Sequence, residues 1–446
     1  MSDLNKFILT ILKQIATQSF SPTYTSRILY VFSTLVYHTQ QSYQYELKSL
    51  TGSSITFQST WPPNRHTQIV LYAAKWSLNK LNQDFFNQSV FVQTFLNQFI
   101  SLQESDYTQL LISHSTEITR LTTELQAYYT LLDADGWKNT ITISLPNGTS
   151  RIDPNAVLPS LIEPSKWTPL INQNFLTPHW GNIQGPLTSV QKEIYKTQFN
   201  TFFETSTNLD SEYTSLFYLT QTMEDQEKVI AEFWAGGPGT VTPPGYWCLF
   251  ASIYWSNQPV LLEKELLTYY LLNAATFQMG ILAWEQKLLH FQERPIQAIR
   301  RLIPEGSLWK PHQPSTFQTP PFPDFVSGHS SFSAAASVIL SRVLGSNLLN
   351  MDLHFDGSLL YLMSPLFNIK YQSKPDLTNL MVYPNTSEIQ ANIPATWISL
   401  SFHSWDEMAL QAGKSRIYGG IHIDSSNYPG YLVGKDVANY LYELIQ

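Results

Sequence analysis

The chain has 446 residues, of which 43% are hydrophobic and only 13% are charged, so it can bury a large core and is not the kind of sequence that stays disordered. Its net charge of -8 argues against a general nucleic-acid binder, which would need a basic face. Its single cysteine, Cys248, excludes an intramolecular disulfide and any zinc or iron–sulfur site built from cysteines.

The N-terminal segment 1–18 is apolar but short, and Lys13 and Gln14 interrupt it. It lacks a small-residue cleavage site, so it reads as an amphipathic helix and not as a signal peptide. No run of about 18 uninterrupted apolar residues occurs, so we expect no membrane span. The default expectation is a soluble, cytoplasmic protein.

The first half of the chain shows helical periodicity broken by polar turns. The helices predicted there cover residues 26–37, 67–80, 90–102 and 107–132. The segment ITISL (141–145) could form a short strand, and the stretch after it, up to residue 190, has no sustained periodicity. We expect this stretch to be an irregular excursion packed on the helices.

Helical patterns return in the second half, with predicted helices over residues 188–203, 211–234, 247–255, 261–289, 332–344, 406–412 and 435–444. The glycine- and proline-rich segment 236–245 should be a loop, and six prolines within 304–323 predict a stiff, extended loop. The predicted fold is therefore all-α, with two packed helical bundles and Pro-rich loops around the active site. We expect one compact body over 1–446, with an N-terminal half (1–210) and a C-terminal half (211–446) that holds the site.

The first candidate motif is Lys287 with Arg294, seven residues apart and followed by Pro295. Seven residues are close to two helical turns, which would place both cations on one helix face. Buried among leucines, they would need an anion or an acidic partner. The alternative is an exposed basic end of a helix.

The second motif, Ser327-Gly328-His329, follows the Pro-rich loop and precedes the helix SSFSAAASVIL. A helix N-terminus offers free N–H groups to an anion, and histidine can exchange a proton near neutral pH. The alternative is an ordinary N-cap at Ser330 or Ser331 beside a surface histidine.

The third motif runs from Ser415 to His422 and contains Arg416 and a Gly-Gly pair. The guanidinium of Arg416 suits two oxygens of a tetrahedral oxyanion, and a neutral imidazole of His422 could ligate an electrophilic centre. The alternative is a glycine turn between helices with a satisfied core histidine.

Taken together, the order Lys-x6-Arg-Pro, Ser-Gly-His and Ser-Arg-x5-His resembles the signature of the vanadium-dependent haloperoxidases and the type-2 phosphatidic acid phosphatases. The motifs span residues 287–422. The resemblance to the haloperoxidase branch extends to residues 21–39, 232–247 and 401–422.

The resemblance implies a role for each motif residue. Lys287, Arg294 and Arg416 would neutralise the oxygens of bound vanadate, and Ser327 with the Gly328 N–H would add hydrogen bonds. His422 would be the metal ligand, His329 the acid–base group, and Lys287 would also polarise bound peroxide. Phosphate could occupy the same site, and no haem or flavin is implied.

The resemblance also suggests a halide position. Trp284 and Phe322 fall where fungal-type chloroperoxidases place aromatic rings beside the halide, which favours chloride or bromide as substrate. The alternative is that both side chains are simply core aromatics.

Two departures stand out. Val326 replaces the usual proline before Ser-Gly-His, and Gly236-Gly237 stand where an acidic residue usually supports the active-site arginine and histidine. Asp225, Glu232, Asp324 or Asp406 could substitute for that residue.

The expected activity is oxidation of halide by hydrogen peroxide to hypohalous acid, with a small organic acceptor. A homo-oligomer is a further expectation. The alternatives are a soluble acid phosphatase with His422 as nucleophile, and a non-catalytic helical scaffold that retains an anion pocket. His354 with Asp352 and Asp356 could be a small metal cluster, but the segment reads as an exposed turn.

Overall fold

The fold is all-α, as predicted, in a computed structural model that describes residues 2–41, 65–102, 109, 111–160, 162–364 and 373–445. The α-helices of at least eight residues are α1 (Asp3–Gln18), α2 (Pro22–Gln41), α3 (His66–Asp84), α4 (Val90–Leu102), α6 (Ser115–Asp133), α7 (Ser189–Thr205), α8 (Leu209–Thr222), α9 (Asp225–Phe233), α10 (Thr242–Ser256), α11 (Leu262–His290), α12 (Pro295–Leu302), α13 (Gly328–Leu344), α15 (Trp405–Tyr418) and α16 (Asp424–Glu443). The short helical turns are η2 (Pro178–Asn182), η3 (Pro304–Gly306), η4 (Gly357–Leu359) and α14 (Leu360–Met363).

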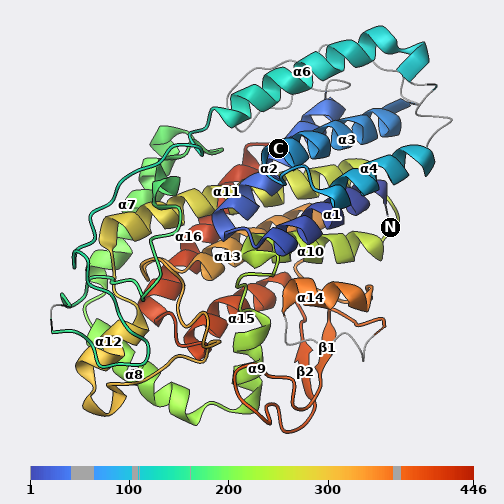
Figure 1. The fold of residues 1–446 in the computed structure, drawn as a ribbon. Coiled ribbons are helices and arrows are strands. Elements are labelled where there is room, and N and C mark those ends of the chain that lie inside the picture. Colours follow the sequence, from blue (N-terminus) through green and yellow to red (C-terminus); the bar gives the residue numbers. More distant parts are fainter. Residues whose placement is uncertain are drawn as a thin grey trace.

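The 29-residue helix α11 runs through the centre of the molecule (Figure 1) and packs against α2, α13, α10 and α16. Apolar residues occur on all of its faces, which is the pattern of a helix surrounded by others. It is long and apolar enough to cross a membrane, yet 94% of its most apolar window is buried inside the protein. The helix therefore has the surroundings of a core helix.

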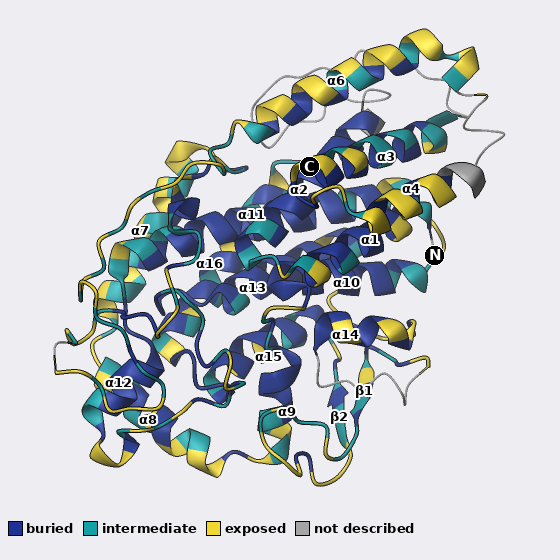
Figure 2. Ribbon diagram, in the orientation of Figure 1, coloured by how far each residue is buried: buried dark blue, intermediate teal, exposed yellow. Residues whose placement is uncertain are grey.

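One hydrophobic core joins the two ends of the chain, because residues of α1 and α2 belong to the same buried cluster as residues of α13 and α16. Figure 2 shows this centre as buried, whereas α6 and α4 expose one face to solvent. The N-terminal segment is a helix with a buried face, as expected, and the hydroxyl of Ser2 caps it by accepting from the N–H of Asn5. The division of the body at residue 210 stays a prediction.

Helices α13 and α16 approach each other closely at two glycines. A Cβ at Gly430 would lie 3.0 Å from the carbonyl oxygen of Ser327, and a Cβ at Gly434 would lie 2.7 Å from that of Ser331. The missing side chains thus let the backbones meet next to the Ser-Gly-His motif.

The predicted strand at 141–145 is wrong, because this segment is irregular. The strands that are described form a two-stranded antiparallel sheet of β1 (Asn379–Val382) and β2 (Ile398–Ser401), with Leu380 opposite Leu400. This hairpin lies in the excursion between α14 and α15.

Several helix boundaries also differ from the prediction. The helix predicted over 211–234 is two helices, because the chain turns at Met223 and the side chain of Glu227 accepts from the N–H of Glu224 at the start of α9. Helix α10 begins inside the predicted loop 236–245, with prolines in its first turn, where no N–H partner is lost.

Further along, α13 begins at Gly328, α15 extends to Tyr418 and α16 begins at Asp424, so each is longer than predicted. Helix α6 begins at Ser115, after a turn at His114 that separates it from the helical residues 111–113, and the predicted start at Tyr107 lies outside the described residues. The Pro-rich loop 304–323 is irregular, as predicted, apart from the turn η3.

Candidate functional site

Residues of the second and third motifs line one pocket of about 260 Å³, and the cations of the first motif lie against the ring of Phe322 in its wall. Polar groups of Gly328, His329, Arg416 and His422 line one part of it. The rest is largely apolar, and its lining residues include Phe20, Pro22, Leu176, Trp284, Phe317, Pro320, Pro321, Phe322 and Phe332. The pocket therefore combines an anion-binding lining with an apolar wall, the usual character of a small-molecule site.

Lys287 and Arg294 lie on different elements, so their predicted placement on one helix face is wrong. Helix α11 ends at His290, because Phe291 adopts a left-handed conformation (φ 50°), and Arg294 is the extended N-cap residue of α12. Both side chains are nonetheless buried and converge on the ring of Phe322, at 4.9 Å for Lys287 and 5.1 Å for Arg294.

Backbone carbonyls hold both cations in place. The ammonium of Lys287 donates to the carbonyls of Pro323 and Asp324, each at 2.9 Å. Arg294 donates from Nε to Phe322 O (2.8 Å) and from Nη1 to Ile421 O (2.7 Å). Its Nη2 is buried without a hydrogen-bond partner, so one donor of this fork is available to a ligand.

The Ser-Gly-His motif begins α13, and its N-cap is Ser327, not Ser330 or Ser331. The Nε2 of His329 lies 2.7 Å from the carbonyl of Trp234. A carbonyl can only accept, so Nε2 carries a proton and Nδ1 is the accepting nitrogen. Burial and the charge of Arg416 hold the pKa of His329 well below its ordinary value, which keeps this imidazole neutral.

Arg416 lies in the last turn of α15, and backbone carbonyls support it. It donates from Nη1 to Ala235 O (3.2 Å) and from Nη2 to Ala231 O (3.0 Å), and its Nε donates to the hydroxyl of Ser415 (2.9 Å). The C-terminal end of α9 and the residues after it therefore hold Arg416 as they hold His329. Gly236, at φ 60°, lets this segment pass close to the imidazole.

His422 is buried and contacts three residues. Its Nδ1 lies against Oδ1 of Asp324 and 3.1 Å from the hydroxyl of Ser426. Its Nε2 lies 3.1 Å from Nη1 of Arg294. Burial and the charge of Arg294 lower the pKa of His422 well below its ordinary value.

Of the four carboxylates named as substitutes for the missing acid, only Asp324 touches the motif residues. Asp225 accepts from the N–H of Ala395, Glu232 contacts His312 and Ser387, and Asp406 contacts Tyr431 and Lys435. Burial raises the pKa of Asp324 to about 6, against the opposing effect of Arg294 and Lys287.

The two halide-site candidates lie together in the pocket wall. The ring centroids of Trp284 and Phe322 are 4.9 Å apart, and the indole N–H of Trp284 donates to Leu176 O at 2.9 Å. Lys287 Nζ is 5.9 Å from the Trp284 ring. The structure thus brings both aromatic side chains next to the cations.

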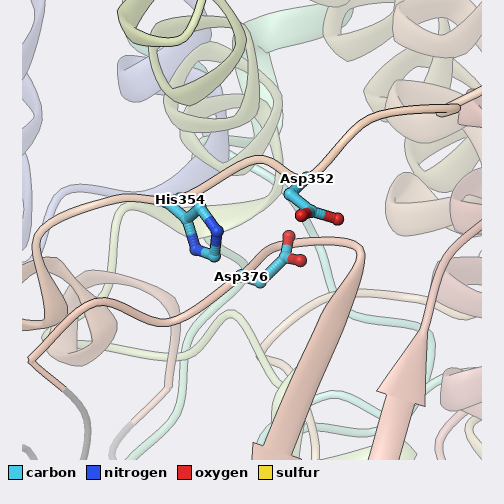
Figure 3. A group of neighbouring side chains, drawn as sticks. All are labelled: Asp352, His354 and Asp376. Carbon is cyan, nitrogen blue, oxygen red and sulfur yellow. The ribbon is translucent and has the colours of Figure 1, made fainter.

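The suspected cluster around His354 has a different membership from the one predicted. Asp352, His354 and Asp376 bring their ligand atoms within 4.8 Å of one another (Figure 3). Asp356 instead accepts from the N–H of Ser358 at the start of η4. Asp352 and His354 are exposed, and exposed groups of this kind often hold no ion, so we assign no metal here.

The structure brings every motif residue to the pocket or its margin. Sequence reasoning missed the hydroxyl of Ser426 and the carbonyls of Trp234, Ala231 and Ala235 as partners of these residues. Backbone carbonyls leave no trace in the residue types, whereas Asp324 had been among four candidates that the sequence could not separate.

Comparison with known proteins identifies the relatives of this fold. Residues 267–446 match the model of the VCPO second helical-bundle domain. A bacterial vanadium-dependent iodoperoxidase is similar over 99% of this chain and 96% of its own, with a TM-score of 0.71 and 20% identity. The holo form of a bacterial vanadium-dependent chloroperoxidase is similar over 96% and 94%, with a TM-score of 0.66 and 14% identity.

No curated protein matches the sequence significantly. The matched domain contains every motif residue from Lys287 to His422, and the shared fold extends over almost the whole chain. On these findings residues 267–446 match the VCPO second helical-bundle domain, and the chain as a whole has the fold of the vanadium-dependent haloperoxidases.

Proposed function

We propose that this protein is a vanadate-dependent haloperoxidase that oxidises chloride or bromide with hydrogen peroxide to hypohalous acid. The observation that carries the proposal is that three buried cations, Lys287, Arg294 and Arg416, surround His422, which lines the pocket, and all three charges lower its pKa. One carboxylate, Asp324, lies among them, and Nη2 of Arg294 lacks a partner. Buried positive charge in excess needs an anion, so the donor set fits vanadate or phosphate.

Each motif residue has a role that its contacts support. Lys287, Arg294 and Arg416 neutralise the anion's oxygens, while Ser327 and the N–H of Gly328 at the start of α13 add hydrogen bonds. His422 offers the lone pair of Nε2 as the ligand. His329, neutral and protonated on Nε2, can accept a proton at Nδ1 from the opposite side.

Bound vanadate would act as a Lewis acid that activates hydrogen peroxide, while the vanadium keeps its oxidation state. Trp284 and Phe322, the rings we propose beside the halide, give this part of the pocket an apolar wall. A small organic acceptor need not bind tightly, since hypohalous acid can diffuse to it. A cytoplasmic location and a homo-oligomer remain predictions.

The test uses metal-free protein in one parallel assay. Bromination of a diketone dye is followed with peroxide and bromide, with and without vanadate, beside hydrolysis of a chromogenic phosphate monoester. We expect bromination that requires vanadate, with chloride as the next substrate. Phosphate release that vanadate inhibits, without halogenation, would assign the pocket to the phosphatase alternative.

The variant His422→Ala separates catalysis from a scaffold role. It should abolish vanadate-dependent turnover while far-UV circular dichroism stays unchanged, because the ligand is lost and the helices are not. Activity that survives this substitution would refute the ligand assignment, and wild-type protein inactive in both assays would support the scaffold alternative.

A further inference from the structure

Asp324 is completely buried beside His422 and belongs to the loop that precedes α13. Its Oδ1 contacts His422 Nδ1, lies 3.0 Å from the Ser426 hydroxyl and 3.6 Å from Nη1 of Arg294. Its Oδ2 has no hydrogen-bond partner. Its strongest contacts therefore converge on one oxygen, the one that faces the histidine.

The hydrogen bonds of His422 specify one tautomer. A guanidinium only donates, so His422 Nε2, 3.1 Å from Arg294 Nη1, must be the accepting nitrogen. A neutral imidazole that accepts at Nε2 carries its proton on Nδ1, and Nδ1 is the nitrogen that faces the Asp324 carboxylate. Both contacts thus demand the same proton position.

The acidic residue that is missing from the segment 234–238 would support the active-site arginine and His329, whereas Asp324 contacts His422. At that segment, the carbonyls of Ala231 and Ala235 support Arg416, and the carbonyl of Trp234 supports His329. The carboxylate of Asp324 supports His422 instead.

We propose that Asp324 is a positioning residue for His422: it holds the Nδ1 proton and thereby keeps the lone pair on Nε2, where the oxyanion would bind in place of the contact with Arg294 Nη1. The inference rests on the proposed function in one respect, the assignment of His422 as the vanadate ligand. Carboxylates that orient a ligating histidine in this way typically change metal affinity by about 10–100-fold.

A positioning role and a purely electrostatic role of Asp324 predict opposite changes in vanadate affinity when the carboxylate is removed. Asp324→Asn removes a negative charge from beside an anion site, so electrostatics alone would tighten the binding of every oxyanion. If Asp324 positions His422, vanadate, which bonds to Nε2, should bind about 10–100-fold more weakly. Sulfate, which forms no such bond, should bind as tightly as before or more tightly.

The experiment measures vanadate and sulfate affinities by isothermal titration calorimetry for wild type and Asp324→Asn. Glu265→Gln is the matched control: it also neutralises a fully buried carboxylate, but on the first turn of α11, and should change neither affinity. A parallel change of both anions, or unchanged vanadate binding, would overturn the inference.

Two further outcomes are informative. If wild-type protein binds no vanadate, the proposed function fails before this inference is reached. If Asp324→Asn does not fold, Ser426→Ala removes the hydroxyl that lies within hydrogen-bond distance of both Asp324 and His422. A selective loss of vanadate affinity in that variant supports the inference, and no loss overturns it.

Discussion

Gly236 occupies a position where the residue type controls both backbone and site. Its φ of 60° is left-handed, and a Cβ there would lie 3.0 Å from Nε2 of His329, the nitrogen that donates to Trp234 O. Gly237, the next residue, has open space around its Cα. The pair therefore offers a contrast between a glycine that the site requires and one that it does not.

We expect Gly236→Ala to lower kcat by roughly 10–100-fold, because the new methyl group displaces His329 from its carbonyl partner and general acid–base catalysis contributes about that much or more. The vanadate affinity should change little, since His422 and the cations are untouched. Steady-state kinetics with bromide check the first expectation and calorimetry the second. Gly237→Ala should behave like wild type, because its φ is not left-handed and a Cβ there would meet no other atom; an equal loss in both variants would contradict the prediction.

At the scale of the helices, the pocket depends on how closely α13 and α16 pack. Gly434 lies directly against the backbone of α13, since a Cβ added there would meet the carbonyl oxygen of Ser331 at 2.7 Å. Gly413 of α15 would meet only side-chain atoms, the nearest being Asn427 Nδ2 at 3.1 Å. Side chains can rotate away, whereas a helix backbone must shift as a whole.

Gly434→Ala should therefore destabilise the protein by roughly 1–3 kcal/mol, even though alanine favours a helix by about 1 kcal/mol. Urea unfolding followed by circular dichroism measures the change. Gly413→Ala is the control and should cost much less. A stabilised Gly434→Ala variant would mean that the two helices can separate without loss of packing.

Sequence patterns predicted long helices better than their ends. The core of α11 is clear from its apolar run, and the Lys-x6-Arg spacing identifies two cations that the structure buries against the same ring, that of Phe322. The same spacing suggested one continuous helix, whereas Phe291 reverses its backbone and starts a new element. Such a left-handed residue cannot be read from a phenylalanine, because tertiary packing and not local preference imposes it.

Other errors have similar physical causes. Thr242 begins α10 because Pro243 and Pro244 are acceptable in a first turn, although the segment looked like a loop. The contact between Asp324 and His422 joins residues that only the folded chain brings together, so the sequence could name Asp324 only as one of four candidates.

At the scale of the whole molecule, the N-terminal helix is tied to the central one by a buried carboxyl group. Glu265 is 1% exposed, and it accepts a hydrogen bond of 2.5 Å from the hydroxyl of Ser2, while its Oε2 has no partner. Burial raises the pKa of Glu265 to about 7. The folded protein thus binds this proton more tightly than the unfolded chain does.

This proton contributes fully to the free energy of unfolding at pH values below the pKa that Glu265 has in the unfolded chain. The contribution is lost as the pH rises toward 7, the pKa of Glu265 in the folded protein. We expect Glu265→Gln to stabilise the protein at pH 8, by on the order of 1–3 kcal/mol, and to leave it near wild type at pH 4.5. Urea unfolding at both pH values checks the difference. The exposed Glu305→Gln serves as a control, and an equal effect of Glu265→Gln at both pH values would contradict the prediction.

The bonds that close the pocket join distant parts of the chain: Arg416 to Ala231 across 185 positions, and Arg294 to His422 across 128. Contacts of such separation form late in folding, since the intervening chain must be ordered first. During biosynthesis Lys287 and Arg294 are therefore made at least 128 residues before His422, the vanadate ligand that we propose. Under the proposed function the cofactor binds only after residue 422 has been added, and a chain that is cut short before this residue lacks the proposed ligand.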